Sequence, residues 1–170
     1  DKDGNGASGD AATPGLDLAG YTLEHDGNGS APTNHLTLDL NGGDITDSGG
    51  TGIIRGYNGS HSATPNVTIQ NVGDVTADVI TTKVSGNSSN PLGYISITQT
   101  GGLTVNELSA YSPASYGASD SMGIELTGNG SGTVSIGTLL AHAGRLITSG
   151  KGVDIDNYYA LTFGFGAALA

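Results

Sequence analysis

The chain has 170 residues, of which 35% are hydrophobic and 12% are charged, and its formal net charge is −11. This length fits a single domain. The five basic residues are scattered along the sequence, whereas nucleic-acid binding requires clustered Lys and Arg. The composition therefore excludes nucleic acid as an expected partner, and its acidity favours solubility and divalent cations.

The sequence contains no Cys, so neither disulfides nor thiolate metal sites stabilise the fold. No apolar run approaches the roughly 20 residues that cross a bilayer, which predicts no membrane span. Because the chain neither begins with Met nor carries a signal peptide, we expect a mature, processed chain or a fragment of a larger one.

Residues 1–14 are predicted to form a polar N-terminal segment. The first six residues, DKDGNG, copy the first half of an EF-hand loop, in which oxygen ligands alternate and Gly takes the sixth position. Asp1, Asp3 and Asn5 are therefore candidate Ca²⁺ ligands. Ala12 stands where the loop needs a bidentate Glu, so a flexible acidic tail is the alternative.

Two apolar residues flanking a polar residue form a unit that recurs along the chain. Its copies are Leu36-Thr37-Leu38, Val67-Thr68-Ile69, Ile95-Ser96-Ile97, Ile124-Glu125-Leu126 and Val153-Asp154-Ile155. The second apolar residues of successive copies are 31, 28, 29 and 29 residues apart. Leu16-Asp17-Leu18, 20 residues before the first copy, is interpreted as the same unit in a shorter first coil. Alternation with a period of two predicts strands with one buried face.

A second strand is predicted after each unit, beyond a turn rich in Gly and Asn. Its apolar markers are Ile45, Val75, Leu103 with Val105, Val134 with Ile136, and Leu161 with Phe163. A third, weaker strand is predicted at Ile53-Ile54, at 80–84, near Leu108 and at Leu139-Leu140.

Strands this short do not bury their apolar faces within one repeat, whereas stacked repeats share a continuous core. We therefore predict an all-β fold, a parallel β-helix (β-solenoid) of about five coils with a repeat of ~29 residues, over residues 15–164. A β-sandwich or jelly roll is the alternative, because evenly spaced short strands also suit those folds.

This arrangement of units and turns resembles the right-handed parallel β-helix superfamily. That superfamily includes pectate-lyase-like enzymes, phage tailspikes and bacterial or archaeal surface repeat proteins. The resemblance covers about residues 15–164 and is one of architecture, without a specific family motif. It implies an extracellular or cell-surface location.

Longer polar stretches precede the first strand of each following coil, at 56–65, 85–93, 112–122 and 143–151. Because they occupy the same position in each repeat, they are predicted to lie on one flank of the solenoid, where β-helix proteins place binding surfaces. The alternative is that they are solvated turns. The chain also holds five sequons for glycosylation, at Asn28, Asn58, Asn66, Asn87 and Asn129. Asn58 and Asn87 are preferred because they fall in the predicted loops.

No catalytic residues are predicted. Enzymes with this architecture that cut acidic polysaccharides need a base beside clustered acids, whereas Arg55, Lys83 and Arg145 have no obvious acidic partner at matching strand positions. Asp154 and Asp156 are expected about 7 Å apart on one strand face, but any D-x-D sequence in a strand gives that spacing. The chain is therefore not expected to be an enzyme, and lyase or hydrolase activity is the least favoured alternative.

The end of the chain is apolar, with a predicted tail at 165–170 and no capping helix. Five residues are predicted to contact another subunit: Tyr159, Leu161, Phe163, Phe165 and Leu169. A soluble monomer should not expose such residues, and uncapped sheet ends invite the addition of another chain.

We therefore expect a non-enzymatic, extracellular structural protein whose subunits self-assemble head to tail into a filament, sheath or surface layer. The alternative is an adhesin or carbohydrate-binding segment of a larger surface protein, with surface glycans as partners.

Overall fold

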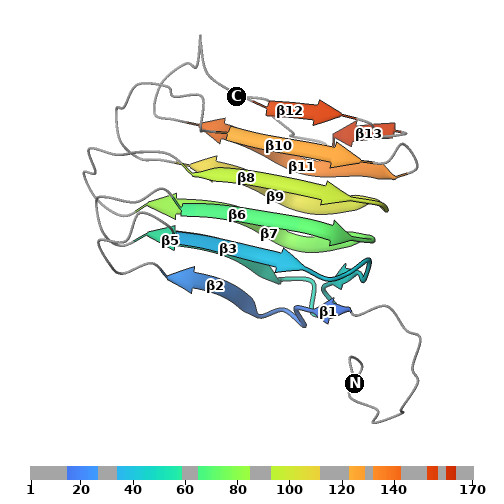
Figure 1. Cartoon of the computed structure of the whole chain (residues 1–170), viewed down its shortest axis with the longest axis horizontal. Coiled ribbons are helices and arrows are strands. Elements are labelled where there is room, and N and C mark those ends of the chain that lie inside the picture. Colours follow the sequence, from blue (N-terminus) through green and yellow to red (C-terminus); the bar gives the residue numbers. More distant parts are fainter. Residues whose placement is uncertain are drawn as a thin grey trace.

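The computed structural model describes residues 15–26, 34–58, 65–84, 93–111, 123–128, 132–142, 153–156 and 160–163. These residues form two sheets and contain no helix (Figure 1). Sheet A contains β1 (Leu16–Asp17), β2 (Thr22–Asp26), β4 (Ile45–Thr46), β5 (Ile53–Asn58), β7 (Val75–Val84), β9 (Leu103–Tyr111), β11 (Thr133–His142) and β13 (Ala160–Phe163). Sheet B contains β3 (Asn34–Asp39), β6 (Pro65–Val72), β8 (Tyr94–Gln99), β10 (Gly123–Gly128) and β12 (Val153–Asp156).

Neighbouring strands within each sheet are parallel. From β5 onward the chain alternates between the sheets, so strands adjacent in space lie one repeat apart in sequence. The strands of the two sheets run in opposite directions (Figure 1). The predicted all-β class is confirmed, and the parallel pairing argues against a sandwich or jelly roll, which are built from antiparallel strands.

The register of sheet B matches the repeat found in the sequence. Leu38 pairs with Ile69, Ile69 with Ile97, Ile97 with Leu126 and Leu126 with Ile155, at the predicted separations of 31, 28, 29 and 29 residues. In sheet A the predicted second-strand markers also pair in succession, from Ile45 through Val75, Leu103 and Val134 to Leu161.

The position of Leu16-Asp17-Leu18 differs from the prediction. This unit was expected to repeat the first strand, but Leu16 pairs with Ile45, so β1 belongs to sheet A. Both sheets use the same apolar-polar-apolar unit, and its sequence therefore does not specify the sheet. The following strand, β2, was not predicted, and it pairs with β5 from Thr22↔Ile53 to Asp26↔Tyr57.

The predicted third strand is not separate in most repeats. Ile80, Leu108 and Leu139 lie in the second halves of the long strands β7, β9 and β11, whereas Ile53 begins a strand of its own, β5.

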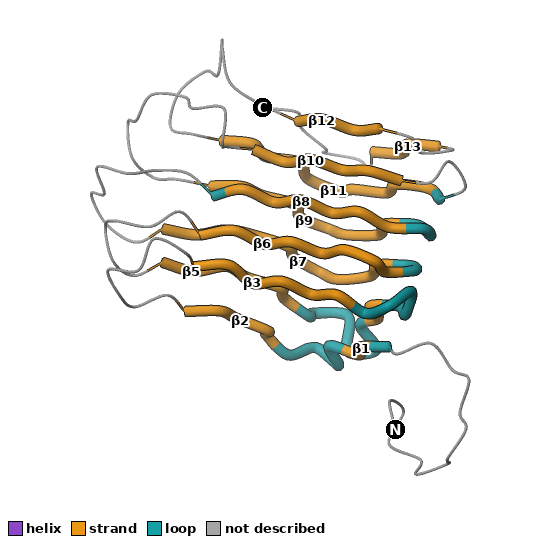
Figure 2. The backbone as a smooth tube through the Cα atoms, viewed as in Figure 1, coloured by secondary structure: helices purple, strands orange, loops and turns teal. Residues whose placement is uncertain are grey.

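The alternation of buried and exposed residues changes phase midway along the long strands. In β7, Ala77 and Ile80 are buried, while the two residues between them, Asp78 and Val79, are partly exposed. Two successive outward residues turn the strand at a corner, and Figure 2 shows the long strands curving. The side chains stack across this corner, where Asn106 Nδ2 donates to Asp78 Oδ1 at 2.7 Å.

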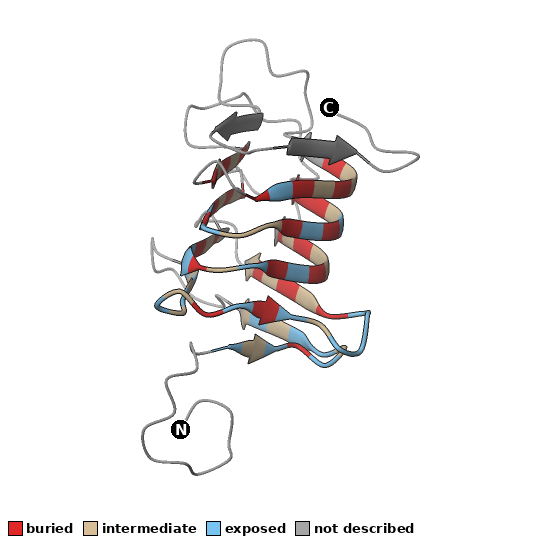
Figure 3. Ribbon diagram, turned by 90° about the vertical axis from the view of Figure 1, so that its right-hand side faces the viewer, coloured by how far each residue is buried: buried red, intermediate tan, exposed pale blue. Residues whose placement is uncertain are grey.

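The core lies between the sheets and consists mainly of Ile, Val and Leu in stacked rows (Figure 3). Ile69, Ile97 and Leu126 are each 0% exposed. Full burial of such a side chain stabilises the fold by about 1.5–3 kcal/mol. Because each row is continuous from strand to strand, every repeat buries its apolar face against its neighbours.

The turns between the sheets are tight and stacked. Asn41 and Gly42 have φ angles of 50° and 87°, a left-handed conformation that Gly adopts freely and Asn tolerates. Gly132 approaches the preceding turn so closely that a Cβ atom on it would lie 1.7 Å from the carbonyl oxygen of Gly101. Backbone bonds join successive turns, as in Val75 N–H to the Gly102 oxygen at 2.8 Å.

Candidate functional site

Most of the predicted site residues lie outside the described residues. These are Asp1, Asp3, Asn5, Asn28, Asn87, Asn129, Tyr159, Phe165 and Leu169, together with the segments 1–14 and 165–170. Most of the predicted loop residues, at 59–64, 85–92, 112–122 and 143–151, lie outside them as well. Leu161 and Phe163 belong to β13 and pair with Val134 and Ile136.

Two sequon residues fall on strands. Asn58 was expected in the loop at 56–65, but residues 56–58 continue β5, of which Asn58 is the last residue. Asn66 lies in β6, where its neighbours in register are His35 of β3 and Tyr94 of β8. The Asn66 side chain is half-buried, and its Oδ1 is buried without a hydrogen-bond partner in the described part of the chain. A glycan needs an open approach to the side-chain amide, so Asn66 is poorly placed to carry one.

The described residues contain no group of three or more His, Cys, Asp or Glu side chains that would hold a metal ion. Instead, several carboxylates accept hydrogen bonds from a neighbouring repeat. Asp44 Oδ1 accepts from the Asp74 N–H at 2.8 Å, and Asp74 Oδ1 accepts from the Gly102 N–H at 2.6 Å. Asp47 accepts from the Gly20 N–H of the preceding repeat at 2.8 Å, and from the Gly52 N–H of its own repeat at 2.6 Å.

Two other carboxylates that accept hydrogen bonds from a neighbouring repeat, Asp17 and Asp39, have lowered pKa values. The Ser48 hydroxyl and backbone N–H, followed by the Ala19 N–H, hold the pKa of Asp17 below 3.8. The side chains of Gln70 and Asn71, followed by the Asn41 N–H, hold the pKa of Asp39 below 3.8. Hydrogen bonds to the charged form cause both shifts.

One charged pair, between Arg55 and Glu24, contradicts the prediction for Arg55. Arg55 was expected to lack an acidic partner, but Glu24 occupies the matching position on β2, and the Arg55 Nε donates to Glu24 Oε2. The pair was missed because β2 was not predicted. Both side chains are about one-third exposed, at 33% and 28%, so the pair contributes little to stability.

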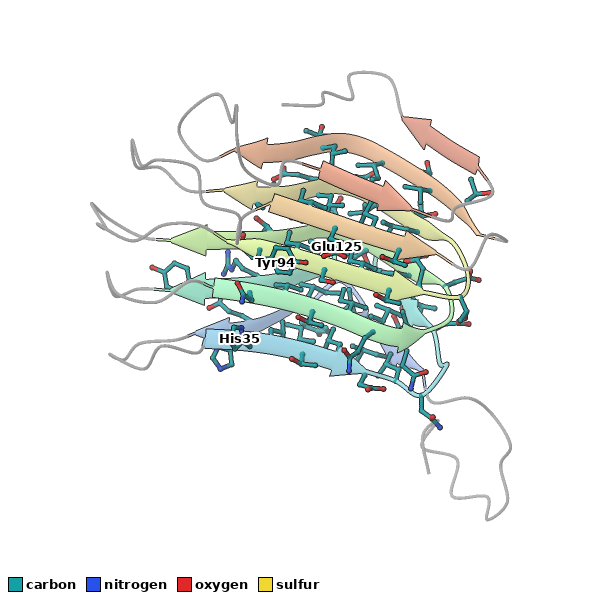
Figure 4. All side chains as sticks on the ribbon, turned by 45° about the horizontal axis from the view of Figure 1, so that its top comes forward. His35, Tyr94 and Glu125 are labelled. Atoms are coloured by element: carbon teal, nitrogen blue, oxygen red, sulfur yellow. The ribbon has the colours of Figure 1, made fainter. Side chains whose placement is uncertain are left out.

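The outer face of sheet B is polar. Tyr94 donates a hydrogen bond to Glu125 on the neighbouring strand, and His35 lies on the same face two strands away (Figure 4). Asp154 and Asp156 are register partners of Glu125 and Thr127 in β10. The row that contains Asp154 is otherwise occupied by Thr37, Thr68, Ser96 and Glu125.

The end of the molecule formed by β1, β2 and β3 is less well covered than its middle. Five leucines that pack on the core are only partly buried, and all belong to this end: Leu16, Leu23, Leu36, Leu38 and Leu40. Within the described residues, each of β1, β2 and β3 pairs along one edge only. His25 of β2 also has a buried Nδ1 without a hydrogen-bond partner there. This end is the candidate site for contact with another molecule.

Comparison with known protein families, with curated proteins and with solved structures finds no match. The part of the chain that the structure describes has no helix long and apolar enough to cross a membrane.

Proposed function

We propose that this chain is a β-solenoid with a repeat of ~29 residues and about five coils, and that it serves as a non-enzymatic, extracellular structural protein. Its subunits stack head to tail, so that the two sheets of one copy continue into those of the next. The product is a filament, sheath or surface layer.

The observation that carries this proposal is the open end formed by β2 and β3. Each strand there has one unpaired edge within the described residues, and partly buried leucines lie beside them. An unpaired parallel edge is a template for another strand. A second copy supplies strands of the same direction: the edge of its β12 is in line with β3, and the edge of its β13 is in line with β1, which leads into β2. Such a contact is heterologous and grows without closing when its rotation does not form a ring.

The use of the acidic residues supports a structural role. Asp17, Asp39 and Asp47 accept hydrogen bonds that join neighbouring repeats. In a catalytic pair, a carboxyl group instead faces the substrate and its pKa is matched to proton transfer.

Electron microscopy and sedimentation velocity of the purified chain test the proposal, together with the variant Leu38→Lys. A charge at the open end of the core opposes stacking, as inward-pointing Lys residues do on natural edge strands. The wild type is expected to form filaments or oligomers that grow with concentration, and Leu38→Lys to remain monomeric with the same circular dichroism.

The matched control is Thr104→Lys, which adds the same charge at an exposed position on the central strand β9. This variant should assemble like the wild type. A wild type that stays monomeric at all concentrations, with Ca²⁺ or with a chelator, would contradict the proposal. Assembly of Leu38→Lys at the wild-type level would contradict the role of the β2–β3 end. Loss of assembly in chelator alone would support the predicted Ca²⁺ ligands Asp1, Asp3 and Asn5.

A further inference from the structure

A groove of about 380 Å³ lies at the stacked turns, but a second groove, on sheet A beyond its corner, has a more varied chemistry. This second groove has a volume of about 320 Å³ and crosses the strands β5, β7 and β9. Ile53 and Val79 supply its apolar surface, while Arg55, Thr81, Glu107 and Ser109 supply polar groups. Apolar surface combined with a few convergent polar groups is typical of small-molecule binding sites.

The polar groups of the groove are held in a connected network. Ser109 Oγ donates to Glu107 Oε1 at 2.7 Å, and it lies 2.8 Å from Thr81 Oγ1. Glu24 accepts a hydrogen bond from the Nε of Arg55 and so orients the guanidinium group beside the groove. The groove thus combines a preorganised acceptor, Glu107, with cationic donors from Arg55.

An aromatic residue extends the groove toward the ends of the strands. Tyr57 follows Arg55 by two residues on β5, so the two side chains lie on the same face. Its register partner is Lys83, which pairs with Tyr111, which in turn pairs with His142. Neighbouring strands are about 4.8 Å apart, so the backbones of Tyr57 and Tyr111 are separated by roughly 10 Å across the strands.

The charges beside the groove indicate which kind of saccharide fits. Arg55 is accompanied by Glu24 and Glu107, and the whole chain carries a net charge of −11. An anionic polysaccharide would meet two carboxylates and an acidic protein, which disfavours its approach. A neutral saccharide offers vicinal hydroxyls to carboxylate and guanidinium groups, and apolar ring faces to Tyr.

We propose that this groove, with Tyr57 beside it, binds a neutral polysaccharide whose chain runs across the strands. Its sugar hydroxyls bond to Arg55, Glu107 and Ser109, and one sugar ring packs against Tyr57. The site lies on a face of sheet A, whereas the proposed assembly contact uses the unpaired edges of its end strands.

Isothermal titration calorimetry tests the inference with oligosaccharides of β-1,4-linked glucose, β-1,4-linked mannose and β-1,4-linked N-acetylglucosamine. Oligogalacturonate is the anionic counterpart. The protein is titrated as the wild type and as Leu38→Lys, so that binding is measured with and without assembly. At least one neutral oligosaccharide is expected to bind both proteins equally. Tyr57→Ala and Arg55→Gln should each weaken that binding about tenfold, as expected when one well-placed contact is lost.

Thr76→Ala is the matched control, because Thr76 is exposed on sheet A before the corner and does not line this groove. It should bind like the wild type. The unfolding midpoint of each variant is measured first, and Tyr57→Ala decides the result if Arg55→Gln is unfolded. The proposal is overturned if no neutral oligosaccharide binds at about 1 mM, if oligogalacturonate binds more tightly, or if Tyr57→Ala leaves the affinity unchanged.

Discussion

At the scale of single residues, Asp39 joins two repeats through its carboxylate. It accepts hydrogen bonds from Gln70 and Asn71, which are 31 and 32 residues later in the sequence. These bonds favour the charged form, so the pKa of Asp39 lies below 3.8 in the folded protein. The hydrogen bonds that Asp39 accepts from the next repeat are therefore stronger when its carboxyl group is ionised.

The direction of the pKa shift predicts how stability depends on pH. A lowered folded pKa stabilises the protein fully above the unfolded value, and this contribution is lost as pH falls through the folded value. The unfolding midpoint should therefore drop as the pH is lowered from 4 toward 2. Asp39→Asn should have a lower midpoint at pH 7 and a shallower acid decline, measured by thermal unfolding at a series of pH values.

The donor side of this contact provides the control. Gln70→Leu removes the largest cause of the shift and should raise the pKa of Asp39 toward 3.8, as followed by NMR titration of the carboxyl carbon. Thr37→Ala, two residues from Asp39 on the same exposed strand face, should leave that pKa unchanged. An Asp39 that titrates at or above 3.8 in the wild type would contradict the bridging role.

At the scale of elements, the row of apolar residues in sheet B that runs from Leu38 to Ile155 should contribute most to stability in its middle. Ile97 is 0% exposed and pairs with Ile69 and Leu126, whereas Leu38 at the end of the row is only partly buried. Ile97→Ala is expected to lower the free energy of unfolding by about 2–5 kcal/mol, and Leu38→Ala by clearly less, because its cavity opens to solvent. Urea unfolding measures both free energies. Equal losses in the two variants would contradict a larger contribution from the middle of the row.

The sequence predicts the strands of this row well, because alternation marks the buried face and the repeat length sets the partner. Leu38, Ile69 and Ile97 were aligned correctly from their spacing alone. The pattern is less informative where both sheets share it, and Leu16 was therefore assigned to the wrong sheet. Its distance of 29 residues from Ile45 gives the observed partner.

The groove on sheet A was not predicted, for two physical reasons. Val79 is apolar, and its residue type alone therefore suggests the core, but its side chain faces outward at the corner. The groove also combines side chains from three strands that are a repeat apart, such as Arg55, Thr81 and Ser109. Only the register between strands brings these residues together, and the third strand of the repeat was the weakest pattern in the chain.

At the scale of the whole molecule, each repeat contacts only its neighbours, so stability is expected to vary along the stack. The middle strands β7, β8 and β9 are paired on both edges, whereas β2 and β3 are paired on one edge within the described residues. Amide hydrogens in β2 and β3 should therefore exchange faster than those of the middle strands in a dilute solution of monomers.

Assembly should reduce this difference. If a second copy adds strands to the edges of β2 and β3, their amides become hydrogen-bonded, and protection there rises with protein concentration. Protection in β8 should stay constant, because its two edges are already paired with β6 and β10. Hydrogen–deuterium exchange with mass spectrometry, over a dilution series of the wild type and of Leu38→Lys, measures both. Protection of β2 and β3 that is independent of concentration in the wild type, while oligomers form, would place the subunit contact elsewhere on the molecule.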